Sequence, residues 1–171
     1  MTRTYQTHLI PGLLQTEGYA RAAFSQLKLT RSRIDDLVTS RLQRQEILAR
    51  ANPPRFWAVI DEAAVSRLML TPKIATEQVE HILHMLELPH VVVEVLPMAC
   101  GLHAGMDGPF VLLDIPNRGV VGYMDTIGDG VLVTEEDRVA EMERRIDLVR
   151  AKTLSASQSA QLLRHLLESI S

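Results

Sequence analysis

The stretch that decides the fold lies within residues 91–125: VVVEVLP (91–97), CGLHAGMDG (100–108), PFVLLDI (109–115) and VVGYM (120–124). The first, third and fourth segments are short and dense in β-branched and apolar residues, and Pro, Gly or Asn closes each of them, which is the pattern of β-strands. They predict a meander of strands at the centre of the fold. The second segment is a glycine-rich loop that holds most of the polar groups able to converge on another molecule. The functional question is whether residues 99–108 form a site or only a connection.

The sequence on either side extends this sheet. Residues 116–119 (PNRG) form a tight turn, which predicts an antiparallel hairpin of the two strands that flank it. A further short strand is predicted at 131–133. Upstream, residues 55–60 have the composition of a strand, and two helices separate them from the strand at 91. Such a connection is long enough for a right-handed crossover, so these two strands can pair in parallel.

Helices are predicted where apolar residues recur at three- and four-residue steps behind a capping residue. They are expected at 16–27, 32–51, 62–70, 73–87, 135–153 and from 155 to the end. Asp61 is placed to cap the third of them. The apolar stripe of the last helix is wide, because Leu162 and Leu166 extend it, and this width indicates a partner helix. We therefore expect one α+β domain over residues 1–171: a mixed sheet of four or five strands, packed by the long helices at 73–87 and 135–153, with additional N-terminal helices beside it.

Composition excludes several functional classes. The chain carries 18 Lys+Arg against 21 Asp+Glu, a formal net charge of -3, so it has no long-range attraction for nucleic acid or for an anionic membrane. A single cysteine excludes an internal disulfide framework and suits a reducing cytoplasm. The N-terminal residues lack the apolar core of a signal peptide, and no run approaches the length of a membrane span. We expect a soluble cytoplasmic protein.

Catalytic and metal-binding patterns are weak. Cys100 and His103 could form a thiol–imidazole pair, but loop spacing does not fix their geometry, and an isolated cysteine is typically a small buried apolar residue. His81 and His84 are three residues apart on a predicted helix, but no carboxylate–histidine motif accompanies them. We predict no metal and no cofactor. Glu94, within the strand at 91–96, needs a partner if it is buried, and a sheet edge or solvent-facing position accounts for it most simply.

Several strings, in order along the chain, carry a resemblance to a known family: LIPGLLQTEGYAR (9–21), RQ (44–45) with IL (47–48), IDEAA (60–64), VLP (95–97), GLHAG (101–105) and GPF (108–110). The chain resembles the domain of unknown function that follows an Xre-type helix-turn-helix in actinobacterial transcriptional regulators of the WhiJ-like, antitoxin-like type. The resemblance covers nearly the whole chain. It departs at Met98, where an aromatic residue is expected, and at Asp125, where the family more often has glutamate.

The resemblance implies transcription regulation and no enzymatic activity. In such regulators, some of which are related to toxin–antitoxin systems, the helix-turn-helix binds DNA. This domain senses an effector or joins the regulator to a partner protein. The implied partners are a second copy of the chain, forming a homodimer, a small acidic protein encoded nearby, and a small-molecule effector. A helix-turn-helix is absent from these 171 residues, so we expect either a fragment of a longer regulator or a stand-alone relative, with DNA contacted only through a helix-turn-helix outside them.

The residues that we predict to bind a ligand or partner lie in and around the glycine-rich loop: Glu62, Arg67, His103, Asp107, Tyr123 and Asp125. The preferred hypothesis is a regulatory sensor or oligomerisation domain. The alternative is a small-molecule-binding or hydrolytic domain whose site is the loop at 99–108.

Overall fold

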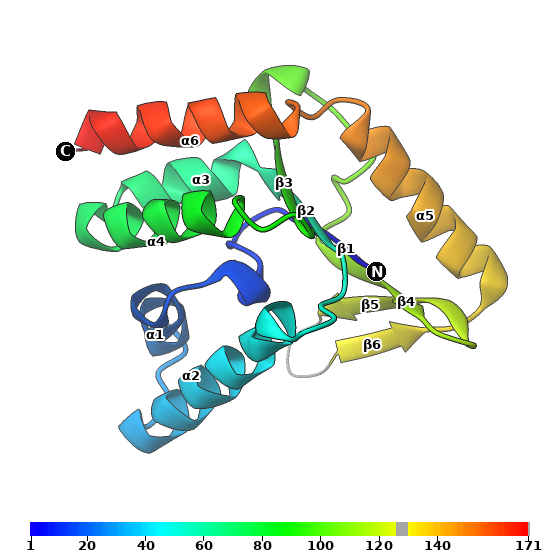
Figure 1. The fold of residues 1–171 in the computed structure, drawn as a ribbon, viewed down its shortest axis with the longest axis horizontal. Coiled ribbons are helices and arrows are strands. Elements are labelled where there is room, and N and C mark those ends of the chain that lie inside the picture. The colour runs from blue at the N-terminus through cyan, green and yellow to red at the C-terminus, as the bar shows by residue number, and fades with distance from the viewer. Residues whose placement is uncertain (126–129, 171) are drawn as a thin grey trace.

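A six-stranded mixed sheet forms the centre of the part that the structure describes, residues 1–125 and 130–170 of a computed structural model (Figure 1). The strand order is β3-β2-β1-β4-β5-β6. The strands are β1 (Thr2–Gln6), β2 (Phe56–Asp61), β3 (Val91–Leu96), β4 (Phe110–Ile115), β5 (Gly119–Asp125) and β6 (Gly130–Val133). β1, β2 and β3 pair in parallel, and β4, β5 and β6 continue the sheet as antiparallel strands. The α+β class is confirmed, but the expected number of four or five strands is wrong.

The strand that the sequence did not predict is β1, and its position changes the topology of the sheet. β1 lies between β2 and β4, so β3 is at the sheet edge and is not a neighbour of β4. The prediction of one continuous meander through residues 91–124 is therefore wrong for β3, whereas the parallel pairing of β2 with β3 and the hairpin of β4 with β5 are confirmed. The sequence of β1, TRTYQ, is mostly polar, and two of its side chains are nevertheless buried: Thr4 is 3% and Tyr5 0% exposed.

Six α-helices surround the sheet in the described residues: α1 (Glu17–Ser25), α2 (Arg31–Gln45), α3 (Glu62–Met69), α4 (Pro72–Met85), α5 (Glu136–Arg150) and α6 (Ala156–Ile170). Short 3₁₀ turns occur at η1 (Gly12–Leu14), η2 (Glu46–Ala49) and η3 (Met98–Cys100). The helix expected over 32–51 is thus an α-helix followed by η2. No helix in this part of the chain is both long and apolar enough to cross a membrane.

Two apolar cores lie on opposite faces of the sheet. On one face, α3, α4 and α6 cover the parallel strands, with the apolar side chains of Ala58 and Ile60 beneath them. On the other face, α5 packs an apolar stripe against Tyr5, Val59 and Leu112. That stripe is buried at all four positions, Val139, Met142, Ile146 and Val149. Figure 1 shows the two helical layers on either side of the strands.

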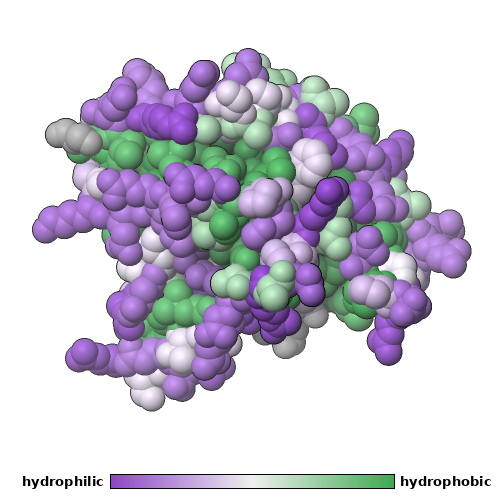
Figure 2. Space-filling view, viewed as in Figure 1, coloured by the Kyte–Doolittle hydropathy of each residue, from purple (hydrophilic) through white to green (hydrophobic). Residues whose placement is uncertain are grey.

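The wide apolar stripe of α6 has a partner within the same chain. α6 packs along α4 and against β3, and Leu166, Leu167 and Ile170 join the core on that face. Figure 2 shows apolar side chains along the seam between α6 and α4, flanked by polar ones. Packing inside one chain therefore accounts for part of this width, including Leu166.

Glu94 occupies the edge strand, as expected, but it does not face solvent. Its side chain is 13% exposed, lies 3.7 Å from Arg150 Nε, and accepts a hydrogen bond from the Thr153 hydroxyl at 3.1 Å. The guanidinium of Arg150 also lies 3.5 Å from the centre of the Trp57 ring. Arg150, at the end of α5, thereby contacts both β2, through Trp57, and β3, through Glu94.

Candidate functional site at the glycine-rich loop

The loop at 97–109 crosses the carboxyl ends of two strands. Because β3 is at the sheet edge and β4 lies beyond β1, the connection between them must pass over the ends of β2 and β1. This explains the length of the loop, which a simple hairpin would not need. It also brings loop residues against the last residues of both strands. In open sheets with parallel strands, this edge is where ligands commonly bind.

A cluster of three side chains lies beneath the loop: Tyr5, Asp61 and His103. The Tyr5 hydroxyl donates a hydrogen bond to Asp61 Oδ2 at 3.2 Å, and His103 Nε2 lies 3.8 Å from the same oxygen. The rings of Tyr5 and His103 meet edge to face, with centroids 6.0 Å apart. The side chain of His103 is 7% exposed and that of Asp61 is 15% exposed.

Backbone contacts fix the orientation of this cluster. The Gly105 amide donates to His103 Nδ1 at 3.2 Å, so in the neutral ring the proton is assigned to Nε2, facing Asp61. The other oxygen of Asp61, Oδ1, accepts from the Ala63 amide at 2.9 Å and caps α3, which confirms the predicted cap. Both carboxylate oxygens and both imidazole nitrogens are therefore directed at groups of the protein itself.

The phenol of Tyr5 is held in its protonated form. Burial raises the pKa of Tyr5 well above its ordinary value of 10.0, and the negative charge of Asp61, with the hydrogen bond to it, raises that pKa further. A phenol in this state donates a hydrogen bond but does not act as a base or nucleophile near neutral pH. The cluster has the properties of a support for the loop.

Gly105 allows the loop to lie directly on the Tyr5 ring. A Cβ at this position would lie 2.7 Å from Tyr5 Cζ, closer than any ordinary contact. Further bonds hold the rest of the loop. Glu62 Oε2 accepts from the Met98 amide at 2.7 Å, and Asp107 forms an ion pair with Arg145 of α5. The loop is fixed at several points by its polar groups.

The outer surface of the loop is apolar. Met98 is 57%, Leu102 84% and Met106 62% exposed, and Leu148 of α5, which borders the same shallow depression as Met106, is 51% exposed. We call these four side chains the loop surface. His103 is thus turned toward the protein, whereas Asp107 remains largely exposed beside Arg145 and the large apolar side chains of the loop face solvent.

A cavity of about 430 Å³ separates the loop from α5. Asp107, Glu141 and Arg145 line it, together with Phe110 and Met142. Arg145 pairs with both acids, and these pairs raise the pKa of Arg145. Asp137 and Arg138 also line this cavity, so its lining contains charges of both signs.

The structure brings three of the six predicted residues, Glu62, His103 and Asp107, together at the loop. It does not bring Tyr123 there, because Tyr123 alternates with Gly122, whose own face of β5 is the one that α5 covers. Arg67 is exposed in the last turn of α3, away from the end that meets the loop. The side chain of Asp125 lies outside the part of the chain that the structure describes.

Neither of the weaker chemical patterns is assembled among the described residues. Cys100 Sγ donates to the carbonyl of Gly101 at 3.5 Å, while the two nitrogens of His103 face other groups. No set of three or more His, Cys, Asp or Glu in the described ranges is arranged to hold a metal ion.

Sequence reasoning missed the role of Tyr5. Its only local signal was the presence of β-branched and aromatic residues in TRTYQ, which indicates a strand. The polar character of the segment makes this signal weak. Asp61 was recognised as a cap but not as an acceptor for a residue 56 positions away.

Comparison with known proteins gives one result. No curated protein and no solved structure matches the chain. The model of one family, described as a domain of unknown function (DUF5753), matches residues 1–165. The chain, with its loop-crossed mixed sheet, therefore belongs to the DUF5753 family.

Proposed function

We propose that this chain is a recognition domain of a cytoplasmic, antitoxin-like transcriptional regulator and that its loop surface contacts another protein subunit. The observation that carries the proposal is the exposure of large apolar side chains on a loop that is bonded to the body of the protein: Leu102 is 84% exposed, whereas His103 of the same loop is almost buried. Exposed apolar residues on an ordered loop are typical of protein–protein contacts, in which methionine is enriched.

The arrangement favours recognition over hydrolysis. A general base must reach the proton of a bound substrate, and both nitrogens of His103 are already directed at Gly105 and Asp61. The resemblance to WhiJ-like regulators supports the same reading. In this proposal a helix-turn-helix elsewhere in the regulator contacts DNA, in agreement with the formal net charge of -3 of these residues.

The partner that we propose first is a second copy of the chain, forming a homodimer, with a small acidic protein encoded nearby as the additional partner. A fixed support lowers the entropy lost on association, because its loop is already ordered before the partner arrives. The bonds of Glu62 to the Met98 amide and of Asp107 to Arg145 provide this order.

Sedimentation analysis over a range of concentrations tests the proposal. The wild-type chain, of 19.1 kDa, should show a concentration-dependent dimer, and the double variant Leu102→Ser/Met106→Ser should remain a monomer. Leu70→Ser is the matched control, because Leu70 is 80% exposed at the far end of α3. Each of these surface changes should alter the free energy of unfolding by no more than about 0.5 kcal/mol.

Two results would contradict the proposal. One is a wild-type chain that stays monomeric and does not bind the small protein encoded beside its gene. The other is a dimer that Leu70→Ser weakens and the double loop variant does not.

A further inference from the structure

His103 lies between a backbone donor and a carboxylate, and these two neighbours have opposite effects when the imidazole takes up a proton. On one side, the Gly105 amide donates to Nδ1 at 3.2 Å. On the other side, Nε2 lies 3.8 Å from Asp61 Oδ2, a separation at which charges attract each other but a hydrogen bond does not form. The contacts of the ring therefore depend on its charge.

Only the neutral ring can bond to the Gly105 amide. An unprotonated Nδ1 carries the lone pair that accepts this hydrogen bond, whereas a protonated imidazole has a donor at both nitrogens and no acceptor. In the cation, the Nδ1–H group would face the Gly105 N–H group, while the Nε2–H group would be attracted to Asp61. Protonation thus opposes the contact between the ring and the loop backbone and favours the contact beneath it.

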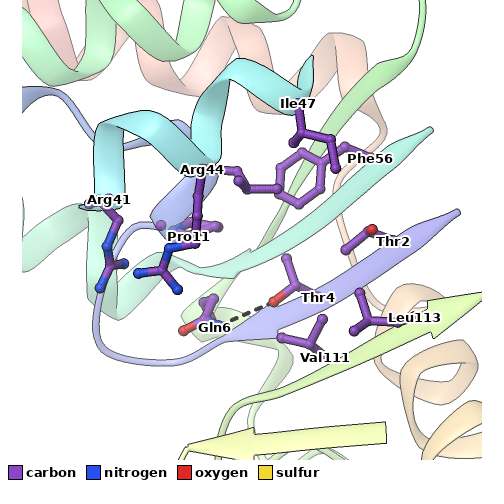
Figure 3. A pocket seen from close by; sticks show the side chains of 12 residues that line it. Thr2, Thr4, Gln6, Pro11, Arg41, Arg44, Ile47, Phe56, Val111 and Leu113 are labelled. Atoms are coloured by element: carbon purple, nitrogen blue, oxygen red, sulfur yellow. Dashed lines mark hydrogen bonds between the residues drawn. The ribbon is translucent and has the colours of Figure 1, made fainter. Parts of the chain in front are cut away.

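Packing prevents the ring from avoiding this conflict by rotation. The side chain of His103 is 7% exposed, and its ring meets the Tyr5 ring edge to face, with an angle of 85° between their planes. Tyr5 is directed at the loop, because its neighbours in β1, Thr4 and Gln6, line a cleft on the opposite face of the sheet (Figure 3). A flip of the ring would still leave a donor at each nitrogen. The remaining response is a movement of the backbone at residues 103–105.

The other charged and titratable groups that the structure describes around His103 have partners of their own. Four of them border the same shallow depression as His103 and form ion pairs with one another: Asp107 of the loop and Glu141, Arg144 and Arg145 of α5. Three more are bonded to backbone groups of the loop: Glu62 to the Met98 amide, Lys152 to the Leu102 carbonyl and Cys100 to the Gly101 carbonyl. Within the described part of the chain, Asp61 is the only acid that forms an ion pair with His103.

We propose that His103 is a pH-dependent switch of the loop: uptake of a proton by the imidazole breaks the bond to the Gly105 amide and releases the backbone at residues 103–105. Leu102 and Met106 flank this segment, so acidification changes the loop surface. Weaker dimerisation in acid follows from this change. That consequence rests on the proposed function, whereas release of the loop does not.

Amide exchange with solvent, measured by NMR alongside titration of the His103 ring signals, tests the proposal. The pH is lowered from about 8 to about 5, the range in which histidine side chains ordinarily titrate, and each rate is corrected for the intrinsic effect of pH. Exchange of the Gly105 amide should accelerate roughly three- to tenfold, the net strength of one hydrogen bond, at the pH where the His103 signals titrate. The Ala63 amide, which donates to Asp61 Oδ1 at 2.9 Å, is the control and should keep its protection.

His103→Gln tests the role of the proton, because the glutamine side-chain oxygen can accept a hydrogen bond but does not titrate. The pH dependence of Gly105 exchange should disappear in this variant. His165→Gln, which replaces an exposed histidine of α6, is the matched control and should retain it.

The proposal is overturned if Gly105 stays protected while the His103 ring titrates, if Gly105 and Ala63 lose protection together, or if His103→Gln retains the wild-type response. The first two comparisons use the wild-type chain and do not depend on the folding of a variant. Sedimentation at both ends of the pH range separates this result from the proposed function. Loss of Gly105 protection with an unchanged dimer would support the switch and contradict the proposed use of the loop surface.

Discussion

Replacing Gly105 by alanine measures how tightly the loop lies on the sheet. Gly105 is not among the residues with a positive φ, so its backbone accepts alanine, and the loss of unfolded-state entropy alone would stabilise the protein by about 0.4–1 kcal/mol. The new Cβ, however, would lie 2.7 Å from Tyr5 Cζ. Tyr5 is 0% exposed and bonded to Asp61, so its ring has no room to retreat.

The magnitude follows from these opposing effects. Overpacking costs about 1–3 kcal/mol, and displacement of the ring weakens a hydrogen bond to a carboxylate worth about 1.5–3 kcal/mol. After subtraction of the entropic gain, we expect Gly105→Ala to lower the free energy of unfolding by about 2–4 kcal/mol. The sign of this change in the free energy of unfolding decides whether the contact between Gly105 and Tyr5 is rigid. If the loop could move away from the ring, only the entropic gain would remain and the variant would be more stable than the wild type.

Urea denaturation followed by circular dichroism is the assay, with the slope of the transition required to stay constant between variants. Met106→Ala, one residue away and 62% exposed, should change the free energy of unfolding by less than about 0.5 kcal/mol. In a Tyr5→Leu background, which lacks the ring, Gly105→Ala should cost much less. Stability equal to or above that of the wild type, or an unchanged cost in the Tyr5→Leu background, would refute the reasoning.

Three further predictions concern charge. The folded-state pKa of Tyr5 is raised above its ordinary value of 10.0, so the contribution of Tyr5 to stability is present below pH 10 and is lost as the pH rises further. In urea denaturation at alkaline pH, the free energy of unfolding of Tyr5→Phe should therefore fall less steeply with pH than that of the wild type. Burial lowers the pKa of His81 below 6.5, so the contribution of His81 to stability is present above that pH and is lost on acidification. In His81→Gln, the free energy of unfolding should therefore fall less between neutral and acidic pH than it does in the wild type, as measured by urea denaturation. Arg150→Ala should lower the free energy of unfolding by about 2 kcal/mol through loss of its stacking on Trp57 and of its ion pair, and Arg150→Lys should restore only part of this in the same assay.

Most elements could be predicted from local sequence patterns, and the errors have one physical source. Local features such as the Asp61 cap and the turn between β4 and β5 act over a few residues and were predicted correctly. The order of the strands depends on pairing between distant segments. In β1, Thr4 is satisfied by a hydrogen bond to the Phe110 carbonyl, and Tyr5 by one to Asp61, so polar residues occupy a central strand at little cost. Composition alone gives no sign of such partners.

The candidate site was predicted only in part for the same reason. The loop and its inward histidine were identified, because glycines and polar residues in a long connection are visible in sequence. The face of the sheet on which Tyr123 lies depends on the register between β4 and β5, in which Tyr123 pairs with Val111.

The placement of β1 has a consequence for the order in which the molecule assembles during synthesis. β1 precedes both of its neighbours in the chain, and they are made later, at residues 56–61 and 110–115. Within the described residues it is also the only strand that hydrogen-bonds to both the parallel and the antiparallel group. A nascent chain can thus form β2-α3-α4-β3 as one unit and the β4–β5 hairpin as another, and β1 can pair on both sides only when both units have been made. Folding should accordingly be slowed by this long-range pairing.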